Sequence, residues 1–151
     1  MPAPTLQTID RRIATWMSRN AVFLLRVSLA VIFIWFGGLK ILGTSPANEL
    51  VTRTVYWFNP KWFIPFLGAW EVVIGLCMLW RPAIRTSIGL LALQMPGTFL
   101  PLVLLPDICW VHVPWSPTLE GQYIIKNLVL IAAAIAVGGT VNKQRDEVQR
   151  V

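Results

Sequence analysis

Long apolar runs separated by short polar segments dominate this chain. Four of these runs are long enough to cross a hydrocarbon core about 30 Å thick, which takes about 20 residues of helix. They are continuous and do not alternate with a period of two, so they predict helices and exclude the strands of a membrane β-barrel. The predicted spans are residues 21–42, 62–80, 84–105 and 123–141.

The segment before the first span has a different pattern. Within residues 1–20, one helical face carries Leu6, Ile9, Ile13, Trp16 and Met17, and Arg11, Arg12 and Arg19 lie elsewhere. This pattern predicts a basic amphipathic helix lying on the inner membrane surface. Docking on a partner protein is the alternative.

The predicted fold is all-α. It is an integral membrane four-helix bundle with an N-terminal amphipathic interfacial helix. Residues 1–20 form the surface helix, residues 21–141 a single transmembrane domain, and residues 142–151 a polar cytoplasmic tail.

Composition supports a membrane protein. The 151 residues are 56% hydrophobic and 13% charged, with a mean hydropathy of +0.63, whereas soluble domains carry about 25% charged residues. The net charge of +6 comes from basic residues spread along the segment ends, which does not favour a nucleic-acid partner. The positive-inside rule places both termini and the turn at Arg81 and Arg85 in the cytoplasm.

The outer connections are rich in aromatic residues. Within residues 43–61 we expect a short surface helix in 45–58, and residues 106–122 predict an ordered lid that is too irregular for regular elements. We expect Lys40 to extend outward to the interface. The predicted outer-interface group is Lys40, Trp110, His112 and Trp115.

Two small-residue features predict special backbone geometry. Gly37 and Gly38 permit close approach of another helix. Pro96, followed by Gly97, predicts a kink in the third span, because proline removes the hydrogen bond to the carbonyl of Ala92.

Glu71 is the acid that lies deep inside an apolar span. A charge there costs at least about 2.5–3.5 kcal/mol unless it is paired, hydrated or neutralised. A rise of 1.5 Å per residue puts Glu71 and Gln94 near the mid-plane, with a basic residue about 8 Å to either side. The predicted intramembrane polar cluster is Arg26, Glu71, Gln94, Lys126 and Asn127.

Two interpretations of this cluster stay open. In the structural one, Glu71 pairs with Arg26 or Lys126 and locks the bundle. In the functional one, the cluster lines a small polar pocket for a head group, a proton or a quinone carbonyl.

Several site chemistries are excluded by the residue inventory. A single histidine rules out bis-histidine haem, and there is no His/Cys cluster for a metal. His112 with Asp107 and Glu120 would form at most a weak metal site. Cys77 and Cys109 are predicted at opposite ends of the spans, beyond the ~7 Å Cα separation that a disulfide allows.

Four short motifs resemble the DoxX-like family of small four-helix membrane proteins. They are Arg26 with Gly37-Gly38-Leu39-Lys40, Glu71-Val72-Val73-Ile74-Gly75, Leu93-Gln94-Met95-Pro96-Gly97, and residues 120–127 with the sequence EGQYIIKN. The resemblance implies a four-helix bundle in a bacterial inner membrane. The family includes members linked to thiosulfate:quinone oxidoreduction and to membrane oxidoreductase complexes.

The first functional hypothesis is a non-catalytic accessory subunit that packs against a larger membrane complex of redox or bioenergetic type. No intrinsic cofactor is expected, although a quinone or a bound lipid is compatible with the cluster. The alternatives are a quinone-linked oxidoreductase subunit with a site around Glu71, and a small-solute or proton carrier.

Overall fold

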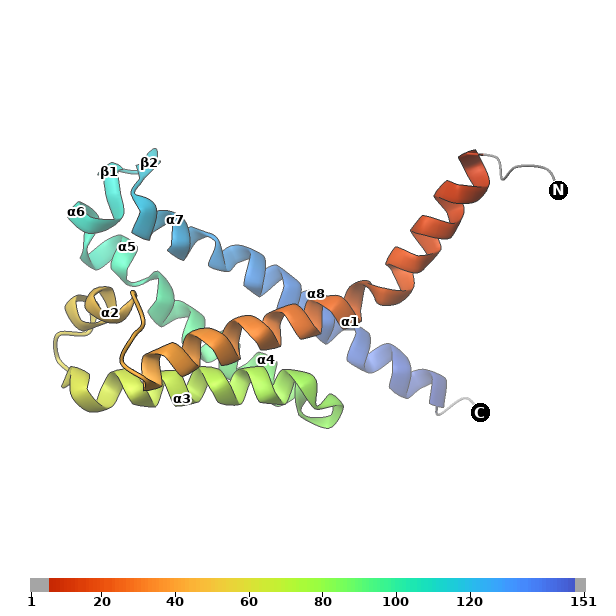
Figure 1. Ribbon diagram of the computed structural model, residues 1–151, viewed down its shortest axis with the longest axis horizontal. Helices are drawn as coiled ribbons and strands as arrows, with labels where there is room; N and C mark the ends of the chain where they lie inside the picture. Colours follow the sequence, from red (N-terminus) through yellow and green to blue (C-terminus); the bar gives the residue numbers. More distant parts are fainter. Residues whose placement is uncertain (1–5, 149–151) are drawn as a thin grey trace.

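The computed structural model describes the backbone of residues 6–148 and the side chains of residues 6–140. It is mostly helical (Figure 1). The elements in chain order are α1 (Leu6–Ile41), α2 (Asn48–Thr54), α3 (Pro60–Leu79), the 3-10 helix η1 (Arg81–Ala83), α4 (Ile84–Phe99), α5 (Pro101–Leu104), α6 (Pro106–Cys109), β1 (Trp110–His112), β2 (Ser116–Pro117), α7 (Leu119–Ile125) and α8 (Asn127–Val148).

Four helical segments are long and apolar enough to cross a membrane, as predicted. They are Leu6–Ile41, Pro60–Leu79, Arg81–Leu104 and Leu119–Thr140. Only 22–33% of the most apolar window of each segment is buried inside the chain. Most apolar side chains therefore face outward, as they do in a membrane protein whose surface is solvated by lipid.

The long helices pack in a definite order. α1 lies along α3 over most of its second half, α3 also packs on α4, and α8 contacts both α1 and α4 (Figure 1). Their shared core is apolar and is built around Leu29, Phe33, Ile74, Met78, Leu91 and Val137. The short elements α2, α5, α6, β1, β2 and α7 gather at one end of the long helices and are called the cap below.

α1 joins two predicted elements. The predicted surface helix and the first span form one helix without interruption at residue 20, and its N-terminal part bends away from the other helices (Figure 1). α8 likewise runs on to Val148, into the segment predicted as a polar tail. Residues 1–5 and 149–151 of the predicted end segments lie outside the described chain.

The third span is not interrupted at Pro96, where the sequence predicts a kink, but after Phe99, three residues further on. α4 continues past Pro96 to Phe99, and the helix is broken at Leu100, directly before Pro101. Proline cannot donate a backbone hydrogen bond, so the carbonyl of Gly97 loses its usual partner. The amide of Leu100 donates to that oxygen instead, at 3.3 Å.

The lid at residues 106–122 is ordered, but the prediction that it lacks regular elements is wrong. It contains α6, an antiparallel β1–β2 pair and the start of α7. Thr118 joins these elements, because its hydroxyl donates to the carbonyl of Ile108 at 2.6 Å and accepts from the amide of Gly121 at 3.2 Å. This hydroxyl caps α7 and ties it to α6.

The crossing of α1 and α3 depends on two glycines. A Cβ atom on Gly37 would lie 2.6 Å from the carbonyl oxygen of Gly68, and a Cβ on Gly68 would lie 2.6 Å from that of Gly37. The two backbones therefore touch at a point where neither helix carries a side chain. The close approach predicted for Gly37-Gly38 is made by Gly37, since a Cβ on Gly38 would meet open space.

Replacing Gly37 with alanine should destabilise the protein by about 1–3 kcal/mol, because the added methyl group forces the helices apart. The measurement is thermal or denaturant unfolding of the purified protein in detergent. Gly38→Ala is the matched control, and it should be neutral or slightly stabilising. Equal effects of the two substitutions would contradict the glycine contact.

Candidate functional site

Glu71 is the centre of a buried polar cluster. Lys40 from α1 lies with its Nζ atom 2.6 Å from Oε2 of Glu71, and the two residues are 7% and 6% exposed. Gln94 from α4 donates from Nε2 to Oε1 of Glu71 at 2.8 Å. Both carboxylate oxygens thus have partners, and three of the long helices meet at one carboxylate.

The spacing of buried residues brings Lys40 and Glu71 together. On α1 the buried positions include Ala30, Phe33, Gly37 and Lys40, and on α3 they include Ile64, Gly68, Glu71, Gly75 and Met78. Steps of three and four residues keep each set on one helical face. The two faces meet, so each charged residue lies one turn from the glycine of its own helix.

The contact between these faces is reciprocal. A Cβ on Gly37 would lie 2.9 Å from Cβ of Glu71, and a Cβ on Gly68 would lie 2.9 Å from Cβ of Lys40. Each charged side chain therefore starts in the space that the opposite glycine leaves free. In this low-dielectric setting, an ion pair with an additional hydrogen bond compensates for the loss of water.

The predicted ion-pair partners of Glu71, Arg26 and Lys126, are wrong, whereas the predicted neighbour Gln94 does bind it. Arg26 instead caps the end of α3, because its Nη2 atom donates to the carbonyls of Met78 at 3.1 Å and Leu79 at 2.9 Å. Met78 lies seven residues beyond Glu71, which is about 10 Å along the helix. The guanidinium is therefore out of reach of the carboxylate.

Lys126 and Asn127 also lie outside the cluster. Lys126 occupies the turn between α7 and α8, is exposed, and places its ammonium 5.3 Å from the ring centroid of Tyr123. Asn127 begins α8 and is partly buried. α8, which begins at Asn127, packs on α1 and α4.

The prediction that Lys40 extends outward is wrong, because its side chain is buried and pairs with Glu71. Its side chain turns inward to Glu71, because an ammonium gains more from a buried carboxylate nearby than from a longer path to water. Trp110, His112 and Trp115 do lie in the cap, with His112 and Trp115 exposed. Trp110 donates from its ring nitrogen to the carbonyl of Leu102 at 3.0 Å.

Two buried polar atoms near Glu71, one on its neighbour in the chain and one on its hydrogen-bond partner, have no hydrogen-bond partner of their own within the described residues. They are Nε1 of Trp70 and Oε1 of Gln94. Buried polar atoms are nearly always paired, so each of these atoms has the capacity for one further hydrogen bond. Trp70 was not among the predicted site residues, although its position next to Glu71 in the chain was a usable signal.

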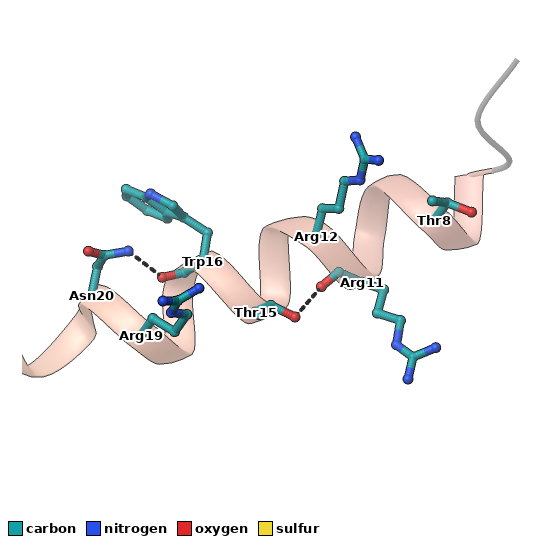
Figure 2. Close-up of a pocket in the computed structure, with 7 residues that line it drawn as sticks. All are labelled: Thr8, Arg11, Arg12, Thr15, Trp16, Arg19 and Asn20. Carbon is teal, nitrogen blue, oxygen red and sulfur yellow. Dashed lines mark hydrogen bonds between the residues drawn. The ribbon is translucent and has the colours of Figure 1, made fainter.

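Among the described residues, no group of three or more His, Cys, Asp or Glu side chains is placed to hold a metal ion. The weak metal site considered for His112, Asp107 and Glu120 therefore has no structural support. A surface hollow lies elsewhere, along the N-terminal part of α1 (Figure 2). Its residues all come from that one helix, among them Arg11, Arg12 and Trp16, and it is open to the surroundings.

Comparison of this chain with protein-family models, curated proteins and solved structures gives no match. Its interpretation therefore depends on the geometry of the Lys40–Glu71–Gln94 cluster and on the surfaces around it.

Replacing Lys40 with methionine should destabilise the protein by about 3–5 kcal/mol, because it leaves a buried carboxylate without its counter-charge. The double variant Lys40→Met/Glu71→Gln should recover most of that loss, since no unpaired charge remains. Unfolding in detergent measures all three stabilities.

Arg53→Met is the control for the ion pair. Arg53 lies 2.6 Å from Glu49 in a pair of exposed side chains, and such pairs contribute little to stability. A loss for Lys40→Met no larger than that for Arg53→Met would contradict a stabilising role for the buried pair.

Both cysteines are free, as predicted. Cys109 is fully buried in the cap. This burial, as the larger cause, and the negative charge of Glu120, as the smaller one, raise the pKa of its thiol. A raised pKa means that less thiolate is present at a given pH, and the thiolate is the species that reacts.

In a Cys77→Ser background, the alkylation rate of Cys109 should therefore rise with pH only above the pH at which an ordinary, exposed thiol begins to react. Glu120→Gln should move this rise to lower pH, because it removes the second cause of the shift. The test is the pH profile of maleimide labelling, followed by mass spectrometry. An unchanged profile in Glu120→Gln would exclude the contribution of that carboxylate.

Proposed function

We propose that this protein is a non-catalytic subunit that packs against a larger membrane complex. The observation that carries this proposal is the saturation of Glu71, whose two carboxylate oxygens bind Lys40 and Gln94 at 2.6 and 2.8 Å. A carboxylate that is satisfied inside its own chain serves to fix α1, α3 and α4 against one another. The cluster then holds the three helices in fixed relative positions, as a structural subunit requires.

The outer surfaces suit a protein with partners. The N-terminal part of α1 stands clear of the other helices (Figure 1) and exposes Ile13, Trp16 and Met17. At the other end, Trp115 of the cap is exposed, and so are Tyr56 and Trp57, which lie just after α2. Exposed aromatic and apolar groups at the two ends favour anchoring in the membrane interface and docking on another protein.

We further propose a four-helix bundle in a bacterial inner membrane, with both termini cytoplasmic and the start of α1 lying on the inner leaflet. The positive-inside rule supports this orientation. The start of α1 and the end of α8 both lie away from the cap (Figure 1), which supports the same orientation. The resemblance to DoxX-like proteins favours a redox or bioenergetic partner.

A quinone-linked subunit is the second candidate, and the unpaired polar atoms favour it. Nε1 of Trp70 has a hydrogen bond to donate, and Oε1 of Gln94 has one to accept. A quinone carbonyl would accept from the indole, and a quinol hydroxyl would donate to the amide oxygen. This version of the site uses Trp70 and Gln94, and it does not include Lys126.

Purification of the tagged protein from its native membrane in mild detergent should yield larger membrane proteins at fixed stoichiometry. Mass spectrometry of the proteins and of lipophilic cofactors in the same sample makes the measurement. Recovery of the chain alone, at several detergent strengths, would contradict the subunit proposal.

The variant Gln94→Met separates the two candidates. For the structural subunit it should lower thermal stability while the stoichiometry of the purified complex stays the same. For a quinone-binding subunit it should also lower the quinone content of the sample. Arg53→Met, an exposed position on α2, is the control and should change neither quantity.

A further inference from the structure

Two arginine residues lie close together where α3 ends, at the end of that helix remote from the cap. Arg26 of α1 and Arg81 of η1 act on each other as like charges. Neither forms an ion pair with any residue whose side chain the structure describes. Like charges destabilise each other, and an anion bound between two guanidinium groups would relieve that repulsion.

The position of Arg26 is fixed by hydrogen bonds. Its Nε and Nη2 atoms donate to the carbonyl of Met78 at 3.2 and 3.1 Å, and Nη2 also donates to Leu79 at 2.9 Å. These bonds use the side of the guanidinium that faces α3. Nη1 keeps its donors for a group that arrives from outside this contact.

Arg81 lies two residues after Leu79, at the start of η1, and is exposed. The Arg26 contacts with the end of α3 therefore bring its guanidinium close to Arg81, and the two act on each other as like charges. Exposed apolar side chains lie beside them, since Leu76, Leu79 and Trp80 all face outward from α3 and its end. A pair of cations thus adjoins an apolar surface at the edge of a membrane span.

We infer that Arg26 and Arg81 form a binding site for the phosphate of an anionic phospholipid. The guanidinium groups bind the phosphate oxygens, and the acyl chains lie along Leu76 and Leu79, with Trp80 at the head-group level. Basic sites between helices at the cytoplasmic side are suited to anionic head groups. The planar, forked guanidinium is also the side chain best matched to phosphate oxygens.

A phospholipid fits better than a soluble anion. Leu76 and Leu79 are 54% and 48% exposed, and within a membrane this surface is covered by acyl chains. A lipid satisfies the two arginines and covers the apolar surface with one molecule. Inorganic phosphate would satisfy only the charges.

Native mass spectrometry in detergent, with added phosphatidylglycerol or phosphatidylcholine, tests the site. The wild-type protein should retain phosphatidylglycerol in preference to phosphatidylcholine. Arg81→Gln should weaken phosphatidylglycerol retention about fivefold, which corresponds to about 1 kcal/mol for one basic residue at the membrane surface. Thermal unfolding of the same samples gives a second reading, because a bound lipid raises the unfolding temperature.

Lys61→Gln is the matched control. It removes the same charge from an exposed side chain at the opposite end of α3, and it should leave the preference for phosphatidylglycerol unchanged. Arg81 makes no hydrogen bond that holds the described helices together, so its substitution should leave the fold intact.

Three results would overturn the inference. The first is equal retention of the two lipids by the wild-type protein. The second is an equal loss of phosphatidylglycerol in Arg81→Gln and Lys61→Gln. The third is stabilisation by inorganic phosphate as large as that by phosphatidylglycerol, which would identify a general anion site.

Discussion

The ion pair between Lys40 and Glu71 is the interaction on which the arrangement of the long helices depends. A carboxylate inside an apolar span needs a counter-charge, and the long helix α1 supplies it only where its backbone touches that of α3. Gly37 and Gly68 permit that contact, and each makes room for the charged side chain of the other helix. Gln94 then adds α4 to the same carboxylate at 2.8 Å. Electrostatics and close packing therefore constrain the same point of the fold.

The sequence was sufficient to predict the spans, the burial of Glu71 and its proximity to Gln94, because hydropathy and residue spacing report length and depth. It did not identify Lys40 as the partner. Depth counting placed that residue at the interface, and the rotation of α1 about its axis is set by contacts with α3. The seven-residue spacing shared by Gly68 and Gly75 on α3 and by Phe33 and Lys40 on α1 held part of this information.

Two further differences have local causes. Arg26 was expected to face Glu71, yet the last carbonyls of α3 lie nearer and have no amide of their own helix to accept from. The connection at residues 106–122 appeared irregular because prolines and aromatic residues obscure any period. Its order comes instead from specific hydrogen bonds, such as those of the Thr118 hydroxyl with α6 and α7. Such bonds join residues whose proximity is decided only after the chain has folded.

The distance in sequence between Lys40 and Glu71 has a consequence for biogenesis. α1 is synthesised first, and on its own it can keep the Lys40 ammonium in water, because that residue lies one position before the helix ends. α3 has no such option, since Glu71 lies near its middle. Its release from the insertion machinery into lipid is therefore favourable chiefly when α1 is already alongside. The order of the helices along the chain thus suits stepwise entry into the membrane, in which α1 enters first and then provides the counter-charge that α3 needs.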